Sequence, residues 1–225
     1  MNGFSPEPGR RQSPRLSRWL GIAAISIGVA LLAWTAVVRF WHDPVTAVYA
    51  EVEQHRLAQA YDNRFAAYHS VAQTLGVAAA RYRTATREGE PLGWITIHRL
   101  GLHAVLVDGT NESDLTRGPG LYRGDFLPGE GHLVYIAGHR TTYSAPFAYI
   151  ERLRPGDVVV ISLPYGTFEY KITGHKIVTA NDVAVLRTGR TEQLILQSCH
   201  PRFSATHRYL AYARLVSATA THKPN

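Results

Sequence analysis

The chain has 225 residues, of which 45% are hydrophobic and 18% charged, and its formal net charge at pH 7 is +7. This composition is typical of a globular protein and leaves room for one ordinary domain with attached segments. The single cysteine excludes an intramolecular disulfide, so a location outside the cytoplasm must be argued from other features. The positive charge does not indicate a nucleic-acid partner, because no stripe of basic and aromatic residues accompanies it.

The amino-terminal region has the pattern of a membrane anchor. Residues 1–18 are polar and rich in arginine, which predicts a disordered cytoplasmic tail. Residues 19–38 contain no charge and are long enough for a helix to cross a hydrocarbon core of about 30 Å. The arginines before this span predict a cytoplasmic amino terminus and an extracytoplasmic domain in a single-pass cell-membrane protein. A cleavable signal peptide is the alternative, but its apolar core is usually only about 7–15 residues long.

The next segment, residues 39–88, is predicted to be a helical stalk or linker, or an appendage packed against the domain. Its apolar residues recur near helical spacing between Val45 and about Arg87, and no chemistry is expected there. The residues on this pattern are Val48, Val52, Leu57, Tyr61, Phe65, Tyr68 and Ala72.

Residues 89–218 are predicted to form an all-β domain, followed by a carboxy-terminal tail at 219–225. Short β-rich runs alternate with turn residues, which favours a closed or nearly closed antiparallel barrel of eight strands. Pro164-Tyr165-Gly166 has the composition of a hairpin turn. The expected strands are Trp94–His98, His103–Val107, Leu133–Ala137, Asp157–Leu163, Phe168–Thr173, Lys176–Thr179, Leu194–Ser198 and Arg208–Val216.

Cys199 is the first residue with candidate chemistry. It follows the expected strand 194–198, and the next strand begins at Arg208. If the two strands are neighbours, Arg208 lies beside the thiol, where its guanidinium can favour the thiolate or donate to an oxyanion. The alternative is that Cys199 is a small buried apolar residue, as most free cysteines are.

His139 is the second candidate, because it follows the expected strand 133–137 as Cys199 follows its own. Two strands that end at the same rim of a barrel would bring the imidazole close to the thiol. Histidine alone is a weak signal, since six others compete: His98, His103, His132, His175, His200 and His207. A zinc site built from His139, Cys199, His200 and His207 lacks paired ligand spacing, so we expect no metal and no cofactor.

An ordered series of motifs resembles the sortases of Gram-positive bacteria, most closely the class E sortases of actinobacteria. The resemblance covers roughly Gly89 to Val216. It implies a closed eight-stranded β-barrel and a cysteine transpeptidase. The motifs are Gly118-Pro119-Gly120-Leu121-Tyr122, Leu127-Pro128-Gly129, Ala137-Gly138-His139-Arg140-Thr141-Thr142-Tyr143, Pro146-Phe147, Leu153-Arg154-Pro155-Gly156-Asp157, Thr173-Gly174-His175 and Cys199-His200-Pro201-Arg202-Phe203-Ser204.

Such enzymes cleave a carboxy-terminal sorting signal between Thr and Gly, hold the surface protein as a thioacyl intermediate, and pass it to an amine of a peptidoglycan cross-bridge or lipid II. The resemblance implies that His139, Cys199 and Arg208 are catalytic. His139 would act as acid and then as base, while Arg208 would bind the oxyanion or the substrate backbone. The chain departs from the family pattern in having Ser198 where Thr is usual, and Thr206-His207-Arg208 where Arg-x-Arg is common.

Substrate binding is expected at Ser198 and Tyr122. Class E relatives are associated with Leu-Ala-x-Thr-Gly signals rather than Leu-Pro-x-Thr-Gly, and Tyr122 matches a tyrosine linked to that choice. Alanine carries a backbone N–H that proline lacks, so a tyrosine hydroxyl can favour alanine. The alternative is that Tyr122 is an ordinary amphipathic aromatic at the rim.

Two other functions remain open at this point. An L,D-transpeptidase would share the compartment and the cysteine chemistry, but its short motif that combines His-Gly with Cys is absent. A membrane-anchored β-barrel that binds surface proteins without cleaving them would have no need of a reactive thiol. Modification of Cys199 followed by a cleavage assay separates this binding protein from an enzyme.

Overall fold

The computed structural model describes residues 14–40, 43–67, 74–186 and 191–221. The chain divides into two compact units, residues 1–41 and 42–225. In the first unit, α1 (Pro14–Phe40) includes the stretch Arg18–Val37, which is long and apolar enough to cross a membrane, with a mean hydropathy of 2.2. Residues 14–18, predicted to be disordered tail, are helical because they continue α1. The rest of the predicted tail lies outside the described residues.

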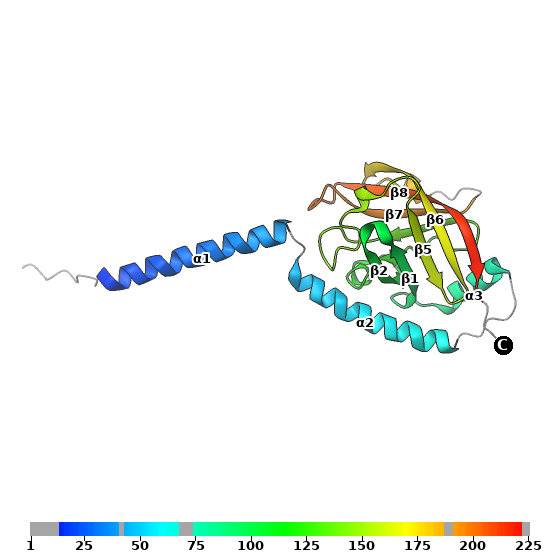
Figure 1. The fold of residues 1–225 in the computed structure, drawn as a ribbon, viewed down its shortest axis with the longest axis horizontal. Helices are drawn as coiled ribbons and strands as arrows, with labels where there is room; N and C mark the ends of the chain where they lie inside the picture. The colour runs from blue at the N-terminus through cyan, green and yellow to red at the C-terminus, as the bar shows by residue number, and fades with distance from the viewer. Residues whose placement is uncertain (1–13, 41–42, 68–73, 187–190, 222–225) are drawn as a thin grey trace, which may run out of the picture. The chain divides into compact units, whose positions relative to one another are not determined.

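The second unit is a closed eight-stranded β-barrel, as the sequence predicted (Figure 1). The strands follow one another around the barrel in the order β1-β2-β3-β4-β7-β8-β6-β5, and β5 pairs with β1. Their bounds are β1 Pro91–Ile97, β2 Leu102–Asp108, β3 Gly120–Leu121, β4 Leu133–Ala137, β5 Val158–Leu163, β6 Gly166–Thr179, β7 Gln193–His200 and β8 His207–Ala220. The helical elements are α2 Pro44–Ala67, α3 Leu75–Ala85, η1 His98–Leu100, α4 Glu112–Leu115, η2 Ile150–Arg152 and η3 Val183–Leu186.

Three details of the barrel differ from the prediction. The expected strands 168–173 and 176–179 form the single strand β6, because an irregularity between Ile172 and Gly174 shifts the register without ending the ladder. The eighth strand is β3, which was not predicted because its two residues carry no periodic pattern. The barrel is also not wholly antiparallel, since β2–β3 and β4–β7 are parallel pairs. The predicted hairpin at Pro164-Tyr165 joins β5 to β6.

The inward and outward faces of β7 and β8 alternate as expected for strands. Leu196 of β7 and Ala211 of β8 belong to the main core inside the barrel. Ile195 and Leu210 point outward and form a second apolar cluster with Leu186 of η3. The connection that carries η3 therefore covers part of the outer face of β7 and β8, on the face to which Cys199 also belongs.

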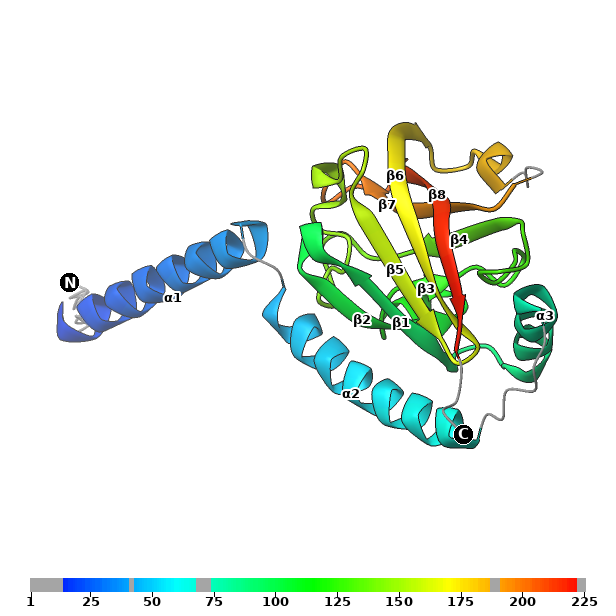
Figure 2. The ribbon, with the colours of Figure 1, turned by 45° about the vertical axis from the view of Figure 1, so that its right-hand side comes forward.

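Helix α2 packs against β1 and β2 and is not a free stalk (Figure 2). Asp43 caps it by accepting a hydrogen bond from the Val45 N–H, and Leu57 is buried against Val105 and Val107 of β2. The side-chain amide of Gln54 bonds both the N–H and the C=O of Val105, at 2.6 and 3.2 Å. The short strand β3 does not reach Val105, so Gln54 satisfies backbone groups that a longer strand would pair.

The predicted stalk residues thus include a helix that belongs to the barrel unit. Tyr68 and Ala72, named in the helical pattern, lie outside the described residues. At the carboxy-terminal end, β8 continues to Ala220, so the first part of the predicted tail is strand.

Candidate active site

The parallel pairing of β4 and β7 brings two candidate residues to one rim of the barrel. Ala137 is opposite Gln197, and the Gly138 N–H donates to the Gln197 carbonyl at 3.0 Å. His139 and Cys199 each follow two residues after this last pair, so both lie at this rim. Parallel strands run toward the same end, which is why the residues after both strands share a rim.

Arg208 occupies the other side of Cys199. The two residues are direct partners in the antiparallel β7–β8 ladder. Such partners project from the same face with Cβ atoms about 4.5–5.5 Å apart. The Arg208 guanidinium donates to the carbonyls of Ala205 and His207, at 2.8 and 3.1 Å. It is therefore held at the end of the loop between the two strands.

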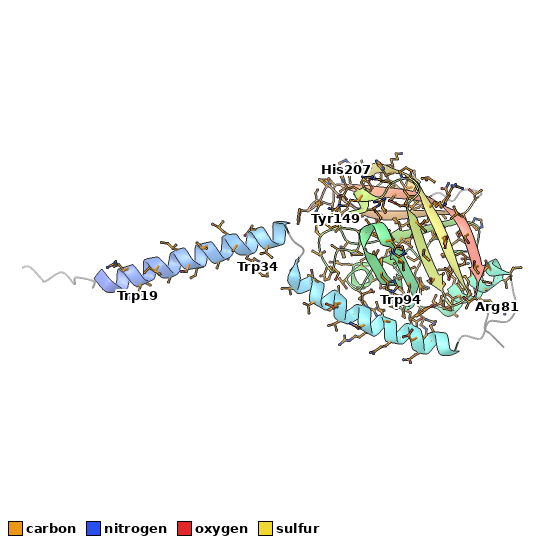
Figure 3. All side chains as sticks on the ribbon, viewed as in Figure 1. Trp19, Trp34, Arg81, Trp94, Tyr149 and His207 are labelled. Carbon is orange, nitrogen blue, oxygen red and sulfur yellow. The ribbon has the colours of Figure 1, made fainter. Side chains whose placement is uncertain are left out.

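Arg202, a second arginine in that loop, is directed elsewhere. Its guanidinium lies 5.3 Å from the ring centroid of Tyr149 and donates to the Ala148 carbonyl at 3.3 Å. Figure 3 labels Tyr149 and His207 at the same end of the barrel. The ladder position favours Arg208 over Arg202 as the partner of Cys199.

His139 is partly buried. Its Nε2 is buried and has no hydrogen-bond partner among the described residues, and its ring centroid is 5.2 Å from that of Tyr143. Burial lowers the pKa of His139 below its usual value, because it disfavours the charged imidazolium, and the negative charge of Glu112 opposes this only in part. The lowered pKa favours the neutral imidazole, which can accept a proton.

Arg140, which the sequence analysis did not single out, connects the segment after β4 to the end of β7. Its side chain is 5% exposed. Its Nη1 donates to the Cys199 carbonyl at 3.0 Å and to Nδ1 of His200 at 2.9 Å, and its Nη2 bonds the Glu151 carboxylate at 2.8 Å. Arginine can only donate, so Nδ1 of His200 accepts and carries no proton. The one available signal was the position of Arg140 directly after His139.

Two small residues, Gly138 and Ser198, directly precede His139 and Cys199 in the chain. Ser198 is fully buried, and its hydroxyl donates to the Gly138 carbonyl at 2.8 Å. A Cβ added at Gly138 would lie 2.6 Å from the ring of Phe147, whose N–H donates to the His139 carbonyl at 3.1 Å. In this structure Ser198 thus holds the peptide before His139, and its predicted contact with substrate stays a prediction.

A groove on the outer face adjoins this rim. It has a volume of about 200 Å³ and is lined by Tyr122, Tyr135, Gln197 and Arg208 on one side and by η3 with its preceding loop on the other. Tyr122 is 36% exposed and its ring packs edge-on against Tyr135 at 6.3 Å. Within the described residues, no three His, Cys, Asp or Glu side chains are grouped as metal ligands.

Comparison with known proteins now identifies the family. Residues 95–216 match the model of the sortase domain. The chain belongs to the sortase family. A curated relative, sortase D of Bacillus subtilis, is 33% identical over 134 residues, which are 57% of this chain and 66% of the relative. Sortase E1 of Streptomyces coelicolor is 32% identical over 90 residues, which are 36% of this chain and 26% of that protein. The match thus spans less than two thirds of each of these relatives.

Solved sortase structures share the fold. The sortase D5 transpeptidase of Clostridium perfringens superposes with a TM-score of 0.63 at 22% identity, covering 74% of this chain and 99% of that one. Sortase E of Streptomyces avermitilis gives a TM-score of 0.54 at 31% identity, covering 60% and 93%. Sortases of classes D and E both match, so membership of class E stays a prediction.

Proposed function

We propose that this protein is a cysteine transpeptidase that cleaves sorting signals between Thr and Gly and transfers the acyl product to an amine. The observation that carries the proposal is the strand register at one rim: Cys199 is the ladder partner of Arg208, and β4, which His139 follows, pairs in parallel with β7 as far as Ala137 opposite Gln197. Membership of the sortase family supports the reaction class.

The two half-reactions follow from the roles of these three side chains. The Cys199 sulfur attacks the Thr carbonyl, and the negative charge that develops on its oxygen is stabilised by the Arg208 guanidinium. His139 takes the thiol proton and gives it to the departing Gly amine as the C–N bond breaks, leaving a thioester. The incoming amine then attacks the thioester, His139 takes its proton, the C–S bond breaks to expel the Cys199 thiolate, and His139 returns the proton to that sulfur.

The groove between η3 and the β7–β8 face is the proposed site of the sorting signal. It adjoins Arg208 and opens beside the rim where Cys199 lies, so a peptide bound along it can present its Thr carbonyl to the thiol. Tyr122 lines the groove, in a position where its hydroxyl can accept the N–H of alanine in a Leu-Ala-x-Thr-Gly signal. The enzyme is thus proposed to prefer this signal over the proline version.

The proposed setting is the outer face of the cell membrane. Helix α1 is proposed to anchor the chain with its amino terminus in the cytoplasm, and the acceptor is proposed to be a peptidoglycan cross-bridge or lipid II amine. Arg18–Val37 supports this topology by length and composition. Protease added to protoplasts should digest the barrel of the anchored chain, and protection of the barrel would contradict the topology.

A peptide assay tests the activity. The full-length protein in detergent is incubated with Leu-Ala-x-Thr-Gly, Leu-Pro-x-Thr-Gly and a scrambled peptide, each with a short amine, and products are read by mass spectrometry. We expect cleavage after Thr and a product joined to the amine. Cys199→Ala should give neither product. Tight binding of the peptides without any cleavage by the unmodified protein would favour a non-catalytic binding barrel instead.

A further inference from the structure

The loop that follows His139 has an unusual backbone. Tyr143, Ser144 and Ala145 have φ angles of 51, 59 and 41°. This left-handed region is disfavoured for residues with a Cβ, and three such residues in succession are rare. A conformation of this kind persists only where surrounding contacts hold it.

The first turn of α2 provides such contacts. The Tyr143 N–H donates to the Thr46 hydroxyl at 2.9 Å, and the Ser144 hydroxyl donates to the Ala47 carbonyl at 3.3 Å. The ring of Tyr49 packs edge-on against that of Tyr143, with 6.1 Å between centroids. Each of the first two left-handed residues therefore has a hydrogen bond to α2.

Helix α2 is itself fixed to the barrel farther along. Gln54 bonds the β2 backbone, and its amide also donates to the Arg117 carbonyl at 2.7 Å. Glu53 pairs with Arg117 at 3.2 Å, and the Arg117 guanidinium donates to the Gly89 carbonyl at 2.7 Å. These contacts hold α2 against the barrel independently of the contacts that its first turn makes with the loop.

The same loop forms part of the surroundings of the proposed proton carrier. The Tyr143 ring is 5.2 Å from the His139 ring, and the burial that lowers the His139 pKa depends on what covers it. The other ionisable groups near His139 are its chain neighbour Arg140 and, through its charge, Glu112. Tyr143 is the link between α2 and His139.

We propose that the first turn of α2 is a positioning element for His139, acting through Thr46 and the left-handed loop 143–145. This inference rests on the proposed function, in which His139 carries the proton. It extends the functional unit beyond residues 95–216, which match the family model, to a helix that begins four residues after the end of α1. The segment that follows the predicted membrane span therefore supports the catalytic rim.

Two substitutions at Thr46 in the full-length protein test the proposal. Thr46→Val keeps the shape of the side chain and removes the hydroxyl, whereas Thr46→Ser restores a hydroxyl. Thr84→Val is the matched control, because the Thr84 hydroxyl donates to the Arg81 carbonyl at an exposed position on α3. For each variant we would measure kcat, KM, the pH profile of kcat/KM and the Tm.

Loss of one hydrogen bond changes a rate or equilibrium constant by about two- to tenfold. We therefore expect Thr46→Val to lower kcat by that factor, while KM stays within about twofold. A loosened loop admits water to His139, which raises its pKa toward the usual value. The limb of the pH profile that reports His139 should therefore move to higher pH. Thr46→Ser should return both quantities to those of the unmodified protein, and Thr84→Val should change neither.

An unchanged kcat and pH limb in Thr46→Val would overturn the proposal. A lower Tm with an unmoved pH limb would also overturn it, because that result describes a purely structural contact. Titration of His139 by NMR, assigned with His139→Gln, needs no substrate and gives a second reading of the same shift. If the unmodified protein cleaves no peptide, the proposed function fails, yet the NMR shift in Thr46→Val still decides whether α2 is coupled to His139.

Discussion

The two sides of Cys199 are built differently. On the β4 side, the His139 ring is half-buried beside the Tyr143 ring, which belongs to the loop held by α2. On the β8 side, Arg208 is half-exposed, bonds carbonyls of its own loop and borders an open groove. The closed side suits proton transfer, which requires fixed geometry and little water, and the open side suits the entry of a peptide.

The largest expected effect is on the closed side. His139→Ala should lower kcat/KM by about 10²–10⁴, because that is the usual contribution of a positioned proton carrier. His98→Ala is the matched control, since His98 is exposed on η1. Steady-state peptide cleavage measures both. A loss of less than tenfold in His139→Ala would mean that the closed side does not carry the proton.

The next effect tests the open side. Arg208→Lys should lower kcat by about 10²-fold, because lysine keeps the charge but not the planar fork that can hold an oxyanion. Arg202→Ala serves as the comparison and should stay within a few-fold of the unmodified protein, since its guanidinium lies over Tyr149. If Arg202→Ala is inactive while Arg208→Ala retains activity, the assignment of the two arginines is reversed.

A smaller effect is expected at the connection between the strands. Arg140→Lys should lower kcat about tenfold and the stability by about 1–3 kcal/mol, because one ammonium cannot bond the Cys199 carbonyl, His200 and Glu151 together. Arg152→Lys is the control, as Arg152 is exposed and stacks on Tyr149 at 4.0 Å. Thermal unfolding and kinetics per folded molecule separate the two effects. Full activity in Arg140→Lys would show that the contacts of Arg140 have no catalytic consequence.

Much of this comparison could be predicted from the sequence. The strands expected on either side of the loop 200–207 predicted that Arg208 lies beside Cys199 if they are neighbours, and the ladder confirms that the two residues are opposite each other. The motif after 133–137 predicted that His139 shares the rim with Cys199, and the parallel pairing explains how. These features are local or depend on neighbouring strands, so a pattern in the chain records them.

Other features depend on contacts between distant segments. The partners of Arg140 lie at positions 151, 199 and 200, and no spacing in the sequence joins them. In the helical pattern of the predicted stalk, Leu57 and Tyr61 are buried, whereas Val48 and Val52 are exposed. The apolar spacing predicted the helix correctly but not which of its residues contact the barrel. Strand β3 was missed because two residues carry no period.

The smallest effect concerns substrate choice in the groove. Tyr122→Phe should reduce the preference for the alanine signal over the proline signal by about two- to tenfold, the worth of one hydrogen bond, without abolishing turnover. Competition between the two peptides in one reaction measures the ratio of kcat/KM directly. Equal rates on both peptides for the unmodified enzyme, or an unchanged ratio in Tyr122→Phe, would remove Tyr122 as the selector.

The central claim is that Cys199 holds the acyl product between the two half-reactions. Because Cys199 is the only cysteine in the chain, intact-mass spectrometry after rapid acid quenching reports its thioester without ambiguity. We predict an adduct with the mass of the peptide up to Thr, mapped to Cys199 and lost on addition of an amine as the joined product forms. If Cys199→Ala forms no adduct and still cleaves the peptide at the rate of the unmodified protein, the account is contradicted.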